Sequence, residues 1–221
     1  MAIILNIDTA VETASVCLAK DNETLQFAIN NNQKDHASWL HSTIQKIISD
    51  TGLTIKDIEA IAVTIGPGSY TGLRVGLSAA KGLCFALNIP LITVNTLEMM
   101  ANAVRNEKAD MICPLIDARR MEVFMAVYDK KMQELIKPCA MIIKPDSFDS
   151  LLASGKILFS GNGSKKLQEI IVHSNAIFNN FIASAADMIN LSEKRNFEKN
   201  FANLSYVEPF YIKEFYSPSR T

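Results

Sequence analysis

The sequence predicts an α/β protein with two similar lobes, each built from a mixed β-sheet flanked by helices. Short apolar runs alternate with amphipathic segments of helical length along the 221 residues. Each half opens with three segments that read as strands at hairpin spacing. The first strand of each half also ends alike, in Ile7-Asp8-Thr9 and in Ile116-Asp117-Ala118, which indicates a weak internal repeat. Together these observations favour a duplicated unit.

The first half is expected to contain strands at 2–7, 14–19, 24–30, 60–65 and 90–94, and helices at 37–50, 71–87 and 96–105. Asp35 is suited to cap the first helix and Gly52 to end it, while Ser69 or Thr71 can cap the second. Three strands at hairpin spacing, followed by helix, strand, helix, strand and helix, resemble a ribonuclease-H-like unit.

The second half restarts this pattern after a short polar stretch at 106–110. Strands are expected at 111–118, 121–128, 134–143 with an interruption at Pro138, and 156–160; helices are expected near 145–153, 164–172 and 183–194. We therefore divide the chain into lobes at 1–106 and 107–221. The aromatic residues that follow Asn196 have no clear period, so we expect an irregular tail packed across the lobes.

Composition narrows the classes of function. The hydrophobic content of 48% permits a substantial core, and the net charge of -1 leaves no broad basic field to grip nucleic acid unaided. The four cysteines are scattered without a C-x-x-C pair, which is typical of small core residues in a reducing compartment. The longest apolar run, at 83–94, is broken by Asn88 and Pro90, and the N-terminus lacks a signal-peptide pattern. These features predict a cytoplasmic protein without a membrane span.

A glycine-rich segment, Gly66-Pro67-Gly68-Ser69-Tyr70-Thr71-Gly72-Leu73-Arg74-Val75-Gly76, is the most informative part of the chain. It follows an apolar strand and opens a helix. Such turns often hold phosphate, because backbone N–H groups and the helix dipole converge there. The spacing matches neither a Walker A loop nor G-x-G-x-x-G. The residues alone leave two interpretations open, a phosphate-binding turn or a plain tight turn.

Duplicated lobes with an acidic residue ending the first strand resemble the actin, Hsp70 and sugar-kinase superfamily. Within it, four segments together closely resemble the bacterial tRNA threonylcarbamoyladenosine biosynthesis protein TsaB (YeaZ) family. The resemblance covers about the first 130 residues, and the glycine-rich segment is its most specific part. The four segments are Ile7-Asp8-Thr9, His41-Ser42, Gly66 to Gly76, and Asp117-Ala118-Arg119-Arg120-Met121-Glu122-Val123.

This resemblance implies a non-catalytic scaffold subunit. TsaB-like proteins pair with a metal-bearing paralogue, TsaD, and with a small ATPase, TsaE. Together these proteins install the threonylcarbamoyl group on N6 of adenosine 37 in tRNAs that read ANN codons, and a separate synthase makes the threonylcarbamoyl-adenylate. The chain is thus expected to meet tRNA through the complex and to form a homodimer when the paralogue is absent.

Metal chemistry is not expected in this chain. The paralogue binds its metal with a His-x-x-x-His pair, and the matching positions here are Thr96 and Met100. Neither belongs to the usual set of protein ligands for zinc or a hard cation. The three histidines, His36, His41 and His173, include no pair spaced by four residues. A metallopeptidase activity is therefore disfavoured.

Nucleotide binding is expected only weakly or within the complex. Superfamily ATPases hold phosphate with Asp-x-Gly-Thr, whereas here Ala10 replaces the glycine and Glu12 adds negative charge. Asp8 could bind a cation or cap turn amides. The turn at 161–164 could hold adenosine or be a plain turn, and the turn at 119–120 could face the cleft or be an exposed hairpin tip. The candidate nucleotide or phosphate contacts are Asp8, Gly66, Gly68, Arg74, Arg119, Gly161 and Gly163.

The two helices at 37–50 and 71–87 carry more apolar surface than a helix that covers one layer needs. Only Arg74, Ser78 and Lys81 form a polar edge on the second. The helices either pack on each other within the lobe or pack on another chain through mainly hydrophobic contacts. The resemblance favours a helix bundle with the paralogue. The candidate interface residues are Trp39, Leu40, Thr43, Ile44, Ile47, Leu73, Leu77, Ala80, Leu83 and Cys84.

The main alternative function is a small-molecule kinase or ATPase of the same superfamily. Titration of the isolated chain with Mg-ATP separates the two hypotheses. Micromolar binding with turnover would favour the kinase.

Overall fold

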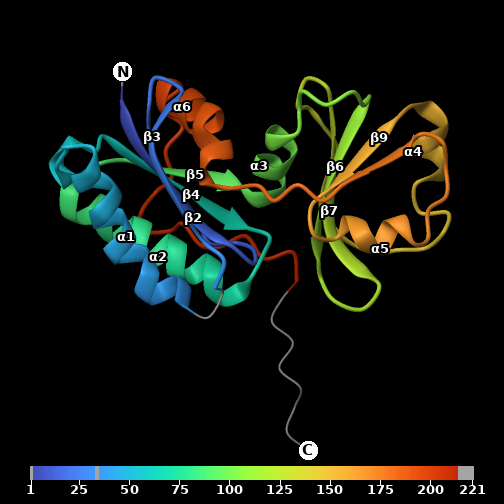
Figure 1. Cartoon of the computed structure of the whole chain (residues 1–221), viewed down its shortest axis with the longest axis horizontal. Coiled ribbons are helices and arrows are strands. Elements are labelled where there is room, and N and C mark those ends of the chain that lie inside the picture. The colour runs from blue at the N-terminus through green and yellow to red at the C-terminus, as the bar shows by residue number, and fades with distance from the viewer. Residues whose placement is uncertain (1, 33–34, 214–221) are drawn as a thin grey trace, which may run out of the picture.

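The computed structural model describes residues 2–32 and 35–213 and consists of two lobes, each built around a five-stranded mixed sheet (Figure 1). The strand order is β3-β2-β1-β4-β5 in the first sheet and β10-β9-β6-β7-β8 in the second. Read from the opposite edge, the second order repeats the first, since β6, β7 and β8 take the places of β1, β2 and β3. The predicted fold class and its internal duplication are confirmed.

The first sheet contains β1 (Ile3–Asp8), β2 (Ala14–Lys20), β3 (Glu23–Asn30), β4 (Ala60–Gly66) and β5 (Leu91–Asn95). In this sheet β1 pairs antiparallel with β2 and parallel with β4. The second sheet contains β6 (Met111–Asp117), β7 (Glu122–Asp129), β8 (Glu134–Ile142), β9 (Ile157–Ser160) and β10 (Ala176–Asn179). There β6 pairs antiparallel with β7 and parallel with β9.

The first sheet is covered by helices on both faces. One face carries α1 (His36–Asp50) and α2 (Tyr70–Leu87), which lie side by side in Figure 1, with the short η2 (Ile55–Asp57) nearby. The other face carries α3 (Thr96–Ala103). Because side chains alternate along a strand, Leu5 and Ile7 of β1 pack under α1 and α2, while Ile4 packs with the α3 side. Burial of β1 on both faces explains why apolar residues occupy successive positions in it, at Ile3, Ile4 and Leu5.

The ends of the first two helices follow the expected chemistry only in part. Ser69 caps α2, and its hydroxyl oxygen accepts a hydrogen bond from the Gly72 N–H at 3.3 Å. Asp35 precedes α1, but its carboxylate makes no cap bond and instead accepts from the Asn32 side chain. Gly52 follows the end of α1 with a φ of 73°, a left-handed conformation that suits glycine.

The second lobe has its own aromatic core. The ring of Phe159 on β9 lies 4.9 Å from that of Phe148 and 5.4 Å from that of Phe178 on β10, measured between centroids. The flanking helices, α4 (Asp149–Ser154) and α5 (Ser164–Gln168), are shorter than the sequence predicts. The sequence pattern did not predict β10, which is only four residues long. Pro138 lies within the edge strand β8, and the predicted interruption appears as a register shift in the pairing with β7, between Met125↔Cys139 and Val127↔Ile136.

After β10 the chain returns to the first sheet. The segment expected as one helix is a 3₁₀ turn, η3 (Ala185–Met188), followed by α6 (Ile189–Phe197). The Ala185 N–H donates to Ser15 Oγ on β2 at 2.8 Å, and Arg195 of α6 bonds both carboxylate oxygens of Glu98 on α3, the closer at 2.6 Å. The division at residue 106 stays a prediction, but α6 lies with the first lobe (Figure 1).

The remaining described residues form an irregular tail, as expected. The Ala202 N–H donates to Leu91 O at 2.8 Å, and the Phe210 N–H donates to Ile65 O at 2.7 Å. The tail then reaches the second lobe, where Lys213 forms an ion pair with Glu122 of β7 at 2.5 Å. The tail therefore contacts both lobes.

Two predictions from the sequence concern the burial of the cysteines and the presence of membrane-spanning helices. Cys17, Cys84 and Cys113 are buried free thiols and Cys139 is half-buried, which confirms their interpretation as core residues. Within residues 2–32 and 35–213, no helix combines the length and apolar character that a bilayer crossing requires.

Candidate functional site

The turn between β1 and β2 is closed by the glycine-rich segment. Thr9 and Ala10 are fully buried. The Ser69 N–H donates to Ala10 O at 2.6 Å, and Thr9 Oγ1 donates to Gly72 O at 2.7 Å. A β-carbon at Gly68 would collide with the Ala10 carbonyl, and one at Gly72 with the Thr9 carbonyl. These glycines serve a close approach of two backbone segments.

Asp8, which ends β1, is enclosed with this turn. Its Oδ1 accepts hydrogen bonds from the Ala10 N–H at 3.0 Å and from Thr64 Oγ1 at 2.6 Å, while its buried Oδ2 has no partner. Burial raises the pKa of this carboxyl to about 6, and the hydrogen bonds offset part of that rise. Asp8 thus caps a turn amide, which is one of its two expected roles. A fully buried side chain cannot contact a nucleotide in the cleft.

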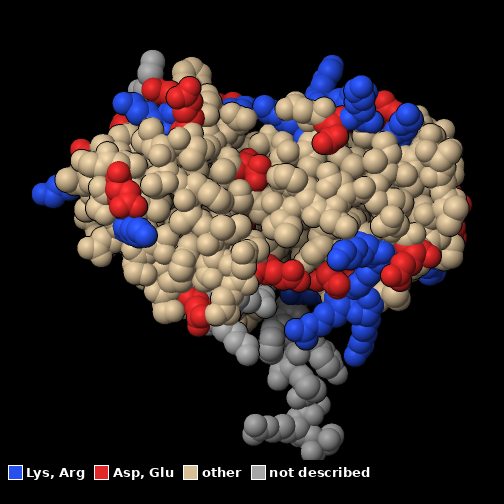
Figure 2. All heavy atoms as spheres, in the orientation of Figure 1, with Lys and Arg blue, Asp and Glu red and all other residues tan. Residues whose placement is uncertain are grey.

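A cleft of about 650 Å³ lies between the lobes, beside the start of α2. Gly68 and Arg119 both line it, as expected for phosphate contacts. Its basic groups are partly neutralised, because Lys166 pairs with Asp117 at 2.5 Å. Figure 2 shows acidic and basic side chains together at the lower edge of the boundary between the lobes. The turn at Arg119 and Arg120 has φ values of 68° and 50° and is exposed.

Arg74 contacts the C-terminal tail through Tyr211. Its guanidinium carbon lies 3.9 Å from the centre of the Tyr70 ring, and its Nε donates to the Tyr211 hydroxyl at 3.1 Å. The rings of Tyr70 and Tyr211 stack at 5.1 Å. Arg74 therefore helps to hold the tail on α2, a role that the sequence pattern did not indicate.

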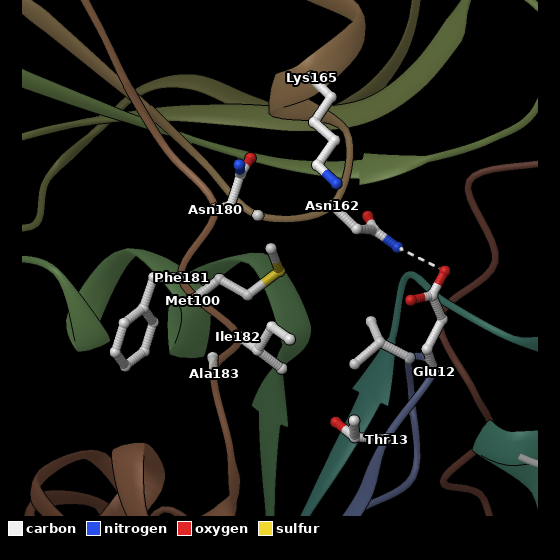
Figure 3. Close-up of a pocket in the computed structure, with 11 residues that line it drawn as sticks. Glu12, Thr13, Met100, Asn162, Lys165, Asn180, Phe181, Ile182 and Ala183 are labelled. Carbon is white, nitrogen blue, oxygen red and sulfur yellow. Dashed lines mark hydrogen bonds between the residues drawn. The ribbon is translucent and has the colours of Figure 1, made fainter. Parts of the chain in front are cut away.

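A second cavity, of about 300 Å³, lies on the other side of Glu12 (Figure 3). Gly161 lines it, whereas Gly163 is buried beneath Leu115. Met100 of α3 contributes its thioether to the wall. No cluster of metal-ligating side chains occurs among the residues that the structure describes. Of the expected nucleotide contacts, Asp8, Gly66 and Gly163 are thus enclosed by the chain itself.

The expected interface set needs correction, because most of its side chains are buried within the single chain. The half-buried members are Trp39, Thr43 and Leu83. The buried members, with 0–4% of their surface exposed, are Leu40, Ile44, Ile47, Leu73, Leu77, Ala80 and Cys84. Six of these side chains pack in one cluster between α1, α2 and the sheet, and Leu73 is likewise fully buried, so none of the seven is available to a partner. The alternative of packing within the lobe accounts for them.

The tail covers a further part of α2. Leu204 and Val207 pack against the same cluster, and Lys81 Nζ donates to Val207 O at 3.1 Å. A helix that is apolar nearly all round is therefore covered by the sheet, by α1 and by the tail of its own chain.

One face of α2 remains open. Phe85 is 84% exposed, and a β-carbon at Gly82 would meet no atom within 4 Å. Phe85 lies seven residues, or nearly two turns, after Ser78 and shares its face. An aromatic residue on the polar edge of the helix was the signal that could have revealed this surface. The exposed residues of α2 are Thr71, Arg74, Ser78, Gly82, Phe85 and Ala86.

The fold and the closed turn define a class, a protein of two duplicated lobes with mixed sheets in which the turn after the first strand is filled by the chain's own backbone. Comparison with known proteins is consistent with this class. The family model "TsaD: tRNA N6-adenosine threonylcarbamoyltransferase" matches residues 27–205. The chain belongs to this family, and within it to the TsaB (YeaZ) proteins.

The relatives agree over most of the chain. It is 29% identical to TsaB of Escherichia coli over 95% of the chain and 94% of that protein. It is 30% identical to TsaB of Bacillus subtilis over 76% of the chain and 74% of that protein. The solved structure of YeaZ from Pseudomonas aeruginosa superposes with a TM-score of 0.83 at 23% identity, covering 96% of this chain and all of that one. The activator of 2-hydroxyisocaproyl-CoA dehydratase from Clostridium difficile, at 11% identity and a TM-score of 0.51 over 91% of this chain and 98% of its own, shares the fold.

Proposed function

We propose that this chain is a cytoplasmic, non-catalytic subunit required for threonylcarbamoylation of N6 of adenosine 37 in tRNAs that read ANN codons. It binds a metal-bearing TsaD-like paralogue, supports its active conformation and helps to recruit a TsaE-like ATPase and tRNA. The relatives named as tRNA threonylcarbamoyladenosine biosynthesis proteins support the pathway.

The closed β1–β2 turn is the observation that carries the non-catalytic assignment. An enzyme that transfers a group from a nucleotide must bring its backbone or cations close to the phosphates. Here Thr9 and Ala10 are covered by Ser69 and Gly72, and Asp8 is buried beneath them. The closed turn also disfavours the alternative function, a small-molecule kinase or ATPase. Titration of the isolated chain with Mg-ATP should therefore show neither micromolar binding nor turnover.

The open face of α2 supports the partner interface. Small residues at Ser78, Gly82 and Ala86 recur every fourth position, which leaves a shallow groove along the helix. The absence of a side chain at Gly82 permits close approach of a partner backbone. Phe85 stands beside this groove as an exposed anchor, and buried aromatic anchors dominate the energy of many interfaces.

Replacing Phe85 by glutamate is expected to abolish co-purification with the paralogue and the homodimer of the isolated chain. A charge would have to be buried without a partner, which costs several kcal/mol, on the order of 2–5. Light scattering and pull-down measure the two effects, and circular dichroism checks the fold.

Phe197→Glu provides the matched control, because Phe197 is 88% exposed on α6. The control variant should assemble normally. If Phe85→Glu dimerises and co-purifies like the unaltered chain, the α2 interface is wrong.

The proposed function is tested by reconstitution. The paralogue, the ATPase, the synthase and substrate tRNA are incubated with and without this chain, and modified adenosine is measured. Modification should require the chain. Modification by the chain without its paralogue, or equal modification when it is omitted, would overturn the proposal.

A further inference from the structure

The cavity of about 300 Å³ between the lobes has the construction of a small-ligand site (Figure 3). It is bounded by the β1–β2 turn, by α3, by the turn after β9, and by the segment 180–183 that precedes η3. Its volume is at the lower end of the range for small-molecule pockets, about 300–1,000 Å³. The occupant must therefore be small.

Most of the wall is apolar. Met100 projects from α3 into the centre of the view in Figure 3, and Ile182 and Ala183 lie below it. Val11 and Phe181 complete this part of the lining. The flexible thioether of a methionine adapts to ligands of different shape. This wall favours an aliphatic group.

The remaining wall carries one acid and one base. Lys165, at the start of α5, has no ion-pair or hydrogen-bond partner among the described residues. Glu12 holds Asn162 by a single long hydrogen bond of 3.5 Å, so its carboxylate retains most of its capacity to accept. Asn180 accepts from Ser164 Oγ at 2.7 Å through Oδ1, which leaves its amide N–H groups free. The positively charged donor of Lys165, the amide donor of Asn180 and the negatively charged acceptor of Glu12 thus line the same cavity.

The wall also contains a buried hydroxyl. Thr13 lines the cavity and is 8% exposed, yet its Oγ1 makes no hydrogen bond. In Figure 3 this oxygen lies on the side of Ile182 and Ala183. A buried hydroxyl without a partner costs about 1–3 kcal/mol.

We propose that this cavity binds a free α-amino acid with an aliphatic side chain. The amino-acid carboxylate bonds Lys165 and the Asn180 amide, its ammonium bonds the Glu12 carboxylate, and its side chain lies against Met100 and Ile182. A phosphorylated ligand fits less well, because the single ammonium of Lys165 is balanced by Glu12. The site is independent of partner binding through α2.

Isothermal titration of the full chain with L-leucine and L-methionine tests the proposal. Both amino acids should bind with one-to-one stoichiometry. Isocaproate lacks the ammonium and isoamylamine lacks the carboxylate, so each should bind about tenfold or more weakly than leucine, because each loses one charge-assisted contact.

Lys165→Met and Glu12→Gln should each weaken leucine binding by about tenfold or more. Lys131→Met is the matched control, since Lys131 is exposed on a turn of the second lobe, and it should bind leucine normally. Three results would each overturn the proposal: no heat with either amino acid at millimolar concentration, binding unchanged in both site variants, or tighter binding of adenosine than of leucine. A failure here leaves the reconstitution assay unaffected, so the two proposals fail separately.

Discussion

Replacing Gly72 by alanine is expected to lower the free energy of unfolding by about 2 kcal/mol. The new β-carbon would collide with the carbonyl oxygen of Thr9, a backbone atom that cannot move aside without opening the β1–β2 turn. Overpacking of this kind costs about 1–3 kcal/mol. The hydrogen bond from Thr9 Oγ1 to Gly72 O would also be strained. Urea denaturation followed by circular dichroism measures the change.

Gly82→Ala is the matched control on the same helix. In the single chain its β-carbon meets no atom within 4 Å, and alanine is the better helix former, so at protein concentrations low enough to keep the chain monomeric the variant should gain about 0.5–1 kcal/mol. Opposite signs at Gly72 and Gly82 would separate packing against the turn from helix propensity. A Gly72→Ala protein as stable as the unaltered chain would show that the turn is not closed as described.

Replacing Asp8 by asparagine is expected to stabilise the protein at pH 8 by about 2 kcal/mol. The pKa of Asp8 rises to about 6 in the folded chain, chiefly through burial, whereas an unfolded aspartate titrates near about 4. The folded state therefore binds more protons between these values, and the stability that Asp8 contributes at low pH is lost as pH rises from about 4 to about 6. A shift of about two pH units corresponds to roughly 3 kcal/mol. The unpartnered amide of asparagine offsets part of the gain.

Unfolding free energies measured from pH 4 to pH 8 test this expectation. The variant should lose most of the decline in that window, although not all of it, because burial also raises the pKa of Asp187, which interacts with Asp8. Asp50→Asn, an exposed carboxylate at the end of α1, is the control and should leave the slope unchanged. Parallel pH profiles for Asp8→Asn and the unaltered chain would contradict the assignment.

The candidate site could be predicted from the sequence only where backbone chemistry dictates it. The glycine-rich segment identified a close approach, but it did not say whether phosphate or Ala10 would fill the space. The apolar faces of α1 and α2 indicated burial, yet Leu40 and Leu77 are covered by the chain's own sheet. The proposed partner contact therefore lies at Gly82 and Phe85, because the sheet, α1 and the tail cover the remaining faces of α2.

By itself the sequence determined the duplicated order of most strands, since alternation of apolar residues and turn signals is local, and it determined that a tight glycine-rich turn follows β4. The tertiary structure alone decided that the segment from α6 to Val207 returns to the first lobe, where Lys81 bonds Val207 and Arg195 bonds Glu98. It also decided that Thr13, Met100 and Lys165 share one cavity. These contacts join residues far apart in the chain, and no local pattern encodes which distant surface will cover a given face.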